Sequence, residues 1–245
     1  MPETTWYILF AALALDLVFG DPEQLPHPVV MMGRVISYLE PVFRQRIEYL
    51  LLSGILFAFC LISATWLAGF LILRTAEAVH PWAGAACQVV LLFYCFSAKS
   101  LEKEAMAVYA ALNRSTLDAA RKAVARIVGR QTRDLDRPAI TRAAVETVAE
   151  NFVDGFLSPL FYFCIGGVPL ALAYKMVNTL DSMVGYRNEK YLLFGRGAAR
   201  IDDAANFVPA RLSILFISLS AMLLSVSRGK KAFQTGLSDG RCHKS

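Results

Sequence analysis

Long uncharged stretches alternate with polar segments along this chain. Residues 49–73 are 25 consecutive uncharged positions, and residues 155–174 are 20. A helix needs about 20 mainly apolar residues to cross a bilayer, so both stretches are long enough to do so. Three further stretches have the same character, at residues 82–98, 208–227 and 6–19, the last two each interrupted by one charged residue.

This pattern predicts an all-α fold: a polytopic α-helical membrane protein in a single domain over residues 1–245. It should have about four to five membrane helices, together with amphipathic helices at the surface. Gly166-Gly167-Val168-Pro169 interrupts the apolar stretch 155–174. That stretch therefore either crosses the membrane or re-enters on the same side, which is tolerated where irregular backbone is buried in protein. No Lys or Arg precedes the first apolar stretch, which favours a retained membrane helix over a cleaved signal.

The shorter polar segments predict elements at the membrane surface. Prolines recur between residues 20 and 28, which excludes a regular helix there and predicts an extended loop. Residues 29–43 should follow as a short amphipathic helix at the interface. Residues 74–81 are a short, nearly neutral link, so the apolar stretches on either side of it should run antiparallel.

The largest polar segment, residues 99–154, predicts at least two non-spanning helices and is expected on the cytoplasmic side. Ser115 followed by Asp118 resembles a capping box at the start of one helix. Gly129 is expected to end that helix, and Asp136-Arg137-Pro138 suits the start of the next one.

Composition supports a membrane protein and adds the distribution of charge. Of the 245 residues, 56% are hydrophobic and 18% charged, with a mean hydropathy of +0.46 and a net charge of +5. Lys and Arg concentrate in residues 99–154, in residues 175–207 and from residue 228 onward. Basic flanks of membrane helices usually face the cytoplasm and its anionic lipid. With residues 99–154 inside, a full crossing at 155–174 would place the basic segment 175–207 outside, against that rule. Sidedness therefore stays open. No motif indicates a nucleic-acid partner.

Acidic residues recur at helical spacing near one end of the polar segment. Glu146, Glu150 and Asp154 are four residues apart, with Arg142 before them at the same spacing, so all of them share one face of a helix. Like charges on one stripe repel unless a cation lies between them. Mg²⁺ is a natural candidate because it takes one or two carboxylates together with substrate phosphates. A solvated helix face paired with Arg142 explains the same spacing.

A second acidic cluster precedes the last apolar stretch. Asp202 and Asn206 share a helix face, Asp203 is adjacent, and Arg211 stands at the start of the apolar run. Two adjacent aspartates can hold a divalent cation or cap a helix N-terminus, and spacing does not decide between these interpretations.

Between the two clusters, residues 174–188 mix polar and apolar positions without a clean period, which is more typical of a site than of packing. Lys175 and Arg187 could hold phosphate or carboxylate groups there, or anchor the chain at the interface. No GxxxxGK[ST] motif is present, so the sequence carries no P-loop.

Short motifs follow one another along the whole chain. They are Asp16-Leu17, Gly20-Asp21-Pro22, Leu25-Pro26-His27-Pro28, Gly33-Arg34, Ile127-Val128-Gly129-Arg130, Glu146-Thr147-Val148-Ala149-Glu150-Asn151, Asp154-Gly155, Ser158-Pro159-Leu160, Tyr174-Lys175 followed by Asn178 to Arg187, and Asp202-Asp203 with Asn206 and Pro209-Ala210-Arg211. In this order they resemble the CobD/CbiB family, the adenosylcobinamide-phosphate synthases of cobalamin (vitamin B12) biosynthesis. In the family the motif Asp239-Gly240, His243, Ser245 leads into a further segment, so we expect the chain to end before the family's C-terminal portion.

The resemblance implies an ATP-dependent ligase that forms an amide bond. Its substrates would be a propionate carboxylate of adenosylcobyric acid and (R)-1-aminopropan-2-ol, or the O-phosphate of that amine. ATP and Mg²⁺ are the implied cofactors, and the corrinoid is a substrate. The implied location is a bacterial inner membrane, where other late cobalamin enzymes are further expected partners; the oligomeric state stays open.

The same reasoning assigns the candidate residues. The expected catalytic residues are Glu146, Glu150, Asp181 and Lys175. The expected substrate- and phosphate-binding residues are Asp21, His27, Arg34, Asn151, Asn178, Arg187, Asn206 and Arg211. The expected metal ligands are Asp202, Asp203 and Asp154. We expect Glu146, Glu150, Asp181 and Asp202 to converge on one polar cavity at the membrane–cytoplasm boundary.

Two other classes of function remain open from the sequence. A membrane transporter would also place acids and arginines beside membrane helices, although transporters commonly carry an internal repeat, and none is visible here. A non-catalytic membrane scaffold for late cobalamin enzymes is the third possibility.

Overall fold

The computed structural model describes residues 4–21, 27–129 and 131–242, and over these ranges the chain is helical with no strands. The helices are α1 (Thr4–Phe19), α2 (Pro28–Arg46), α3 (Leu50–Val79), α4 (Pro81–Phe93), α5 (Ala98–Arg114), α6 (Leu117–Ala125), α7 (Arg137–Phe152), the π-helical turn η1 (Val153–Leu157), α8 (Ser158–Val184), α9 (Arg196–Leu224) and α10 (Val226–Cys242). The predicted all-α fold is confirmed.

Four helical stretches are long and apolar enough to cross a membrane: Leu50–Val79, Pro81–Arg114, Arg137–Val184 and Arg196–Leu224. The shorter helix Trp6–Phe19 is also apolar. These stretches confirm the predicted polytopic membrane protein.

The third of these stretches is broken. Gly166 and Gly167 leave the helical conformation, and Gly167 adopts φ 69° and ψ −164°, a combination open almost only to glycine. The sequence prediction of an interruption at this point is therefore correct. The arm before the break, residues 158–165, is only about 12 Å long at 1.5 Å per residue. The chain then turns back on itself through the second arm of α8.

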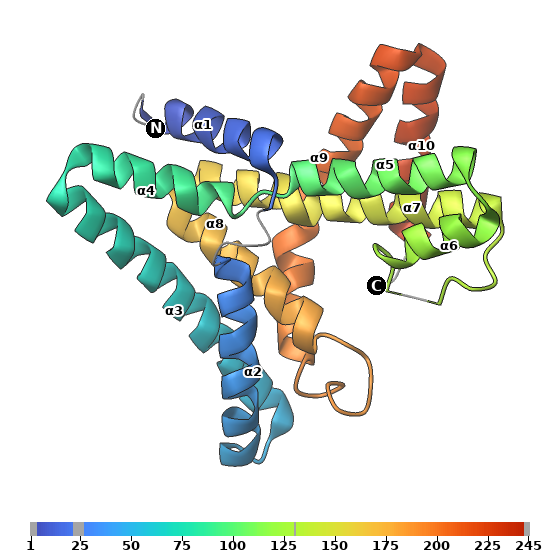
Figure 1. The fold of residues 1–245 in the computed structure, drawn as a ribbon. Coiled ribbons are helices and arrows are strands. Elements are labelled where there is room, and N and C mark those ends of the chain that lie inside the picture. The colour runs from blue at the N-terminus through green and yellow to red at the C-terminus, as the bar shows by residue number, and fades with distance from the viewer. Residues whose placement is uncertain (1–3, 22–26, 130, 243–245) are drawn as a thin grey trace.

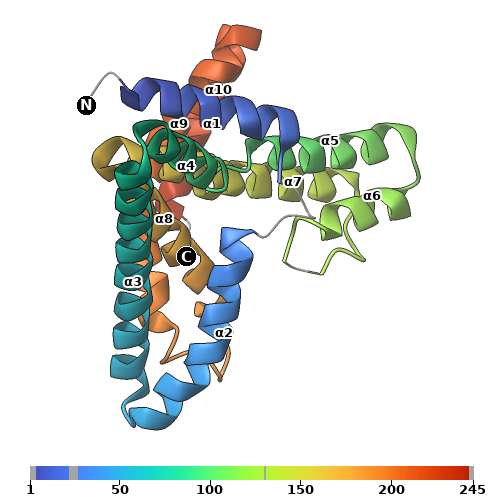
Figure 2. The same cartoon turned by 60° about the vertical axis from the view of Figure 1, so that its left-hand side comes forward.

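The helices form an open, branched arrangement. α4 leads into α5, and α7 runs alongside α5 before continuing through η1 into α8 (Figure 1). α3 packs against α4 and α8, and α10 folds back along α9. After a 60° turn, α2 and α3 are seen to extend together away from the plane of α1, α4 and α5 (Figure 2).

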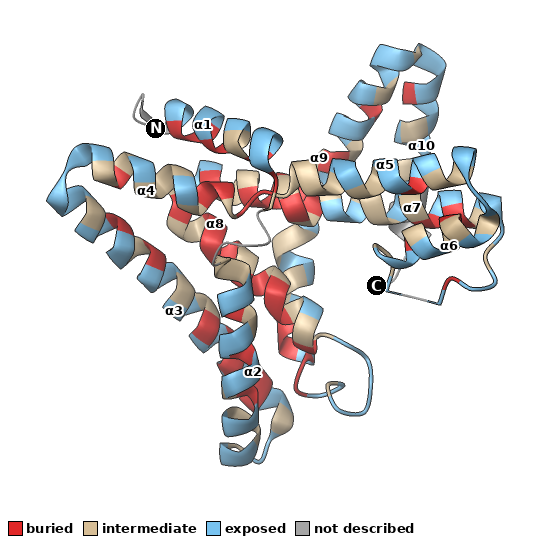
Figure 3. Ribbon diagram, in the orientation of Figure 1, coloured by how far each residue is buried: buried red, intermediate tan, exposed pale blue. Residues whose placement is uncertain are grey.

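Two buried clusters hold these helices together. The larger joins α1, α2, α3, α4, α8 and the start of α9, with Phe57, Phe96, Phe163 and Phe194 almost fully buried. The smaller joins α5, α6 and α7 around Val108, Val124 and Ile140. Buried positions gather along α8 where it meets α3 and α4, whereas most of α9 and α10 is exposed (Figure 3).

The predicted element boundaries are partly wrong. α3 continues to Val79, so residues 74–79 are helical rather than a link, and the break before α4 is at His80. The cap of α6 is Thr116, whose hydroxyl accepts from the Ala119 N–H at 3.3 Å, and not Ser115. α6 ends at Ala125, four residues before Gly129.

Other boundaries agree with the sequence. Asp136 caps α7 by accepting from the Ala139 N–H at 2.8 Å, as predicted. The amphipathic helix after residue 28 is present as α2. The polar residues 174–184 are helical throughout, which the sequence prediction missed. Most of the extended loop predicted between residues 20 and 28 lies outside the described residues.

Candidate functional site

The first polar cavity surrounds Lys175 on the second arm of α8. Its volume is about 320 Å³, and its walls come from the start of α5, the junction of α7 with η1, and α8. The expected residues Asn151, Asp154 and Asn178 line it, as do Ser97, Ser100, Glu104 and Ser182. The Lys175 ammonium lies in electrostatic range of the Asp154 and Asp21 carboxylates. The cavity thus combines one ammonium with acids, amides and hydroxyls.

Asp21 and His27 stand beside this cavity. The Asp21 backbone N–H donates to Ser100 Oγ at 3.3 Å, and Asp21 Oδ1 is 3.5 Å from His27 Nε2. Burial alone would raise the pKa of the Asp21 carboxyl, but contacts with His27, Ser100 and Lys175 lower it overall. His27 also accepts from the Val29 N–H through Nδ1 at 3.2 Å, which caps α2. Its role in the structure is therefore largely to hold this corner together.

The start of α5 is fixed by contacts from two other elements. Asp16 of α1 is fully buried, and its Oδ2 accepts from the backbone N–H groups of Ala98 at 3.0 Å and Lys99 at 3.4 Å. It therefore caps α5 from a distant part of the chain. The Ser97 N–H donates to the Gly155 carbonyl in η1 at 2.9 Å. π-Helical turns are rare and concentrate at functional sites.

A hydrogen-bonded network lies between η1, α8 and α9. Tyr174 Oη is 2.9 Å from Asn206 Oδ1 and 3.3 Å from Asp154 Oδ1, so its single proton can be donated to either. Ser158 Oγ donates to Asn206 Oδ1 at 2.7 Å, and Asn206 Nδ2 donates to Asp202 Oδ2 at 3.0 Å. Asn206 thereby joins α9 to α8, and Asp202 is engaged in holding the Asn206 side chain.

The second polar cavity is acidic and has a volume of about 570 Å³. Glu146, Glu150 and Asp181 line it, together with residues 127–129, Gly185 and Tyr186. Three of the four acids expected to converge therefore do meet at one cavity. Asp202 does not line it, but lies in electrostatic range of Asp181 and Asp154.

The third polar cavity is basic and has a volume of about 680 Å³. Arg187, Arg196, Arg200 and Asp203 line it, with Tyr186 and Tyr191 beside them. Sequence reasoning singled out Arg187 and Asp203 but missed Arg196 and Arg200. The available signal was their spacing, because residues 196, 200 and 203 share one face of a helix.

The three polar cavities are contiguous. The first two share Ile127, Asn151 and Ser182 in their walls. The second and third share Gly185 and Tyr186. Asp181 stands at that second junction: a Cβ added to Gly185 would be 2.0 Å from its Oδ1. A continuous polar line therefore runs from Lys175 past three acids to a group of arginines.

Five of the eight expected binding residues do not line these cavities: Asp21, His27, Arg34, Asn206 and Arg211. Asp21 and His27 stand beside the first cavity. Arg34 is exposed on α2 and is not part of their walls. Arg211 donates to the Phe207 carbonyl at 2.6 Å, and its guanidinium stacks 3.5 Å above the Phe207 ring. Asp202 and Asn206 belong to the network behind the first cavity.

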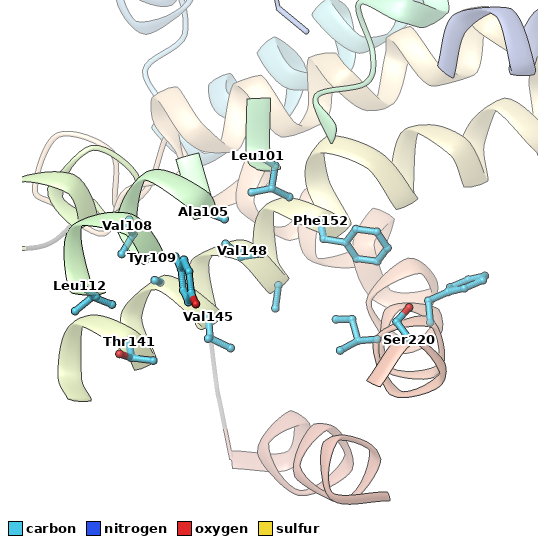
Figure 4. A pocket seen from close by; sticks show the side chains of 14 residues that line it. Leu101, Ala105, Val108, Tyr109, Leu112, Thr141, Val145, Val148, Phe152 and Ser220 are labelled. Carbon is cyan, nitrogen blue, oxygen red and sulfur yellow. The ribbon is translucent and has the colours of Figure 1, made fainter. Parts of the chain in front are cut away.

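A separate apolar hollow of about 540 Å³ lies between α5, α7 and α9. Val108, Tyr109 and Leu112 of α5 face Val145 and Val148 of α7, with Phe152 and Ser220 at the other side (Figure 4). None of the residues lining it is Asp, Glu, His, Lys or Arg. The candidate chemistry is therefore confined to the polar line.

The carboxylates of the cavities offer pairs of metal donors. Among the described residues, no group of three or more His, Cys, Asp or Glu side chains is placed to hold a metal ion by itself. Mg²⁺ usually needs only one or two carboxylates, with phosphate and water oxygens completing its shell. Glu150 and Asp181, which share the acidic cavity and lie in electrostatic range of each other, are a donor pair of that kind.

Comparisons with known proteins identify relatives along almost the whole chain. The family model described as "CobD/Cbib protein" matches residues 9–245. A cobalamin biosynthesis protein CobD from Geobacter metallireducens is 48% identical over 238 residues, covering 97% of this chain and 74% of that protein. CobD from Klebsiella pneumoniae is 44% identical and CbiB from Salmonella typhimurium 42% identical, each over 96% of this chain and 74% of the relative. No solved structure was found to match. The chain belongs to the CobD/CbiB family of cobalamin biosynthesis proteins.

Proposed function

We propose that this protein forms an amide bond between a propionate carboxylate of adenosylcobyric acid and (R)-1-aminopropan-2-ol or its O-phosphate, driven by ATP, in a bacterial inner membrane. The observation that supports this best is the continuous polar line, in which an acidic cavity is flanked by Lys175 on one side and by arginines on the other. Family membership supplies the pathway, and this line supplies residues suited to the chemistry.

Amide formation from a carboxylate requires activation, because the carboxylate is a poor electrophile. In the proposed route a propionate oxygen takes up the terminal phosphoryl group of ATP and ADP leaves. The amine nitrogen then attacks the acyl carbon, the bond from that carbon to the phosphate oxygen breaks, and the amine loses a proton. Catalysis of phosphoryl transfer rests mostly on positioning and charge neutralisation, which asks for cations around phosphate and for carboxylates around metal and amine.

The residues of the polar line can be assigned to these tasks. Mg²⁺, when bound, would neutralise phosphate charge, and the acids that face the cavities are available to hold it: Glu150, Asp181, Asp154 and Asp203. Asp202 is less available because it accepts from Asn206. Glu146 stands in the same cavity as Glu150 and can accept the proton that the amine loses.

The decisive experiment uses the purified chain in detergent with adenosylcobyric acid, ATP, Mg²⁺ and either form of the amine. We expect one ADP and one phosphate for each amide formed, and none without ATP. Corrinoid uptake into liposomes without amide formation would instead identify a transporter. Absence of both activities, with late cobalamin enzymes bound, would identify a scaffold.

A further inference from the structure

The basic cavity gathers guanidinium groups from two neighbouring segments. Arg187 follows the end of α8, while Arg196 and Arg200 lie one turn apart at the start of α9. Arg196 and Arg200 are both exposed. Within the described ranges, neither of these two side chains pairs with a carboxylate, although Asp203 lines the same cavity. Their charges are thus available to a ligand.

Residues 185–195, which join α8 to α9 and include Arg187, are held from two sides. Glu40 of α2 forms ion pairs with Arg44 and Lys190, both at 3.0 Å, and accepts from the Tyr191 hydroxyl at 3.2 Å. The Arg44 guanidinium also donates to the Lys190 carbonyl. These contacts fix the middle of the segment against α2.

A glycine of α3 fixes the other end. The Phe194 carbonyl oxygen approaches Gly54 so closely that a Cβ there would be 1.7 Å from it. Gly197 packs in the same way against Ile55, where a Cβ would be 2.9 Å from the nearest side-chain atom. The arginines therefore stand on a backbone that is fixed in place, which is what a binding site requires.

The sign of the charge identifies the class of ligand. The neighbouring acidic cavity shares Gly185 and Tyr186 with the basic one, so a ligand that spans both meets arginines at one end and carboxylates at the other. Guanidinium groups match phosphate oxygens in geometry and charge. We infer that the Arg187–Arg196–Arg200 cavity binds the phosphate groups of a substrate whose reacting end points toward Glu150 and Asp181. This assignment rests on the proposed function for its choice of phosphate esters: ATP or the amino alcohol O-phosphate.

The test measures binding to detergent-purified protein without any corrinoid. Radiolabelled ATP and (R)-1-aminopropan-2-ol O-phosphate are titrated separately, in the presence of Mg²⁺. The double variant Arg196→Gln with Arg200→Gln should bind the ester that occupies this cavity about 10- to 100-fold more weakly. Each charge-assisted hydrogen bond contributes roughly tenfold to the affinity. Arg74→Gln removes an exposed arginine on α3 that pairs with Glu77, and should leave both affinities unchanged. Arg196→Lys with Arg200→Lys should retain part of the affinity.

Each outcome decides the assignment. Loss of ATP affinity places the nucleotide in this cavity, and loss of affinity for the amine ester places that substrate there. Unchanged binding of both esters in the Gln double variant, or binding of neither by the wild-type protein, overturns the assignment. Should the double variant fail to fold, the wild-type protein still gives an answer. Pyrophosphate should protect Arg196 and Arg200 from an arginine-directed reagent, and absence of protection overturns the assignment.

The result is separable from amide formation. Normal amide yield and unchanged binding in the double variant would contradict only the phosphate assignment. Arginine-dependent binding of a phosphate ester by a protein that makes no amide would contradict only the proposed function.

Discussion

At the scale of single residues, Asp181 occupies the position where the acidic and basic cavities meet. It lies in electrostatic range of Glu150 in the acidic cavity and of Asp203 in the basic cavity. Its carboxylate packs against Gly185, one of the two residues that both cavities share. A carboxylate at this junction is suited to hold a metal ion between the two halves of the site.

We expect Asp181→Asn to reduce amide formation by about a hundredfold or more, the scale of losing one preorganised electrostatic contact to a transition state. The substitution keeps the shape of the side chain, so the melting temperature in detergent should change little. The rate of ADP-coupled amide formation measures the first effect and thermal unfolding the second. Asp134→Asn, at an exposed position between α6 and α7, is the matched control and should alter neither.

The competing view is that Asp181 serves only as an interfacial ion-pair partner. Loss of such a pair would cost about 1 kcal/mol or less at an exposed position, with turnover largely intact. Near-normal turnover in Asp181→Asn would remove it from the site.

At the scale of elements, local signals predicted helix starts better than helix ends. Asp136 caps α7 as predicted because a cap depends only on residues within one turn. Ser115 was wrong as the cap of α6: it is the residue that ends α5, where its N–H donates to the Ala111 carbonyl. Thr116 then takes the capping role. That competition between two adjacent helices is not visible in a single capping motif.

Residues 174–184 have a helical period of buried and polar positions that the sequence prediction missed. The buried positions Val177, Leu180 and Val184 recur at helical spacing. Lys175, Asn178 and Ser182 recur on another face, and all three line the first cavity. The segment looked irregular because its polar stripe faces a cavity inside the protein, whereas an ordinary surface helix shows a polar face to solvent.

The remote cap on α5 gives a prediction of its own. Asp16→Ala removes the acceptor for two backbone N–H groups, and we expect a loss of about 1–2 kcal/mol, the usual cost of deleting a cap. The amides of Ala98 and Lys99 should also exchange faster with solvent. Hydrogen exchange read by mass spectrometry measures this directly.

Asp118→Ala is the control, because its exposed pair with Arg121 on α6 should contribute only about 0.5 kcal/mol. Equal effects of the two substitutions, or unchanged exchange at the start of α5, would contradict a capping role for Asp16.

The contact between α3 and the segment 185–195 gives another prediction. Gly54→Ala places a methyl group on the Phe194 carbonyl oxygen, and we expect a loss of about 1–3 kcal/mol from overpacking. Gly33→Ala is the matched control, because its nearest neighbour is the flexible Met183 side chain at 3.4 Å. Alanine favours a helix over glycine by about 1 kcal/mol, so Gly33→Ala should be neutral or stabilising. Thermal unfolding in detergent compares them, and a lower melting temperature for Gly33→Ala than for Gly54→Ala would refute this packing.

At the scale of the whole molecule, the path of α8 explains how distant acids and bases meet. Asp154 lies in η1, and the chain then leaves along the first arm of α8 and turns back at Gly166 and Gly167. The return brings Tyr174 within 3.3 Å of Asp154, twenty residues away in sequence. The sequence indicated the acidic clusters, Lys175 and Arg187, and the glycine interruption separately, but not Arg196 and Arg200. Their juxtaposition depends on tertiary contacts among η1, α8 and α9, for which no local pattern exists.

The exposed apolar surface predicts the behaviour of the whole protein in solution. Val79 is 81% and Trp82 79% exposed at the tip between α3 and α4, and Leu223 is 89% exposed on α9. Such surfaces are not stable in water at this extent. We expect the chain to sediment with membranes, to resist extraction by alkaline carbonate and to need detergent for purification. Recovery as a monodisperse protein without detergent would contradict this.

The fixed segment between α8 and α9 has a consequence for the way a ligand is selected. Its contacts with Glu40, Arg44 and Gly54 are made within the protein alone, so the backbone at the cavity is in place before any ligand arrives. A cavity formed in advance loses little conformational entropy on binding, and association then needs no closing step. Discrimination between similar anions would therefore occur at first encounter, through charge and shape, and competing cellular phosphates would be rejected by rapid release.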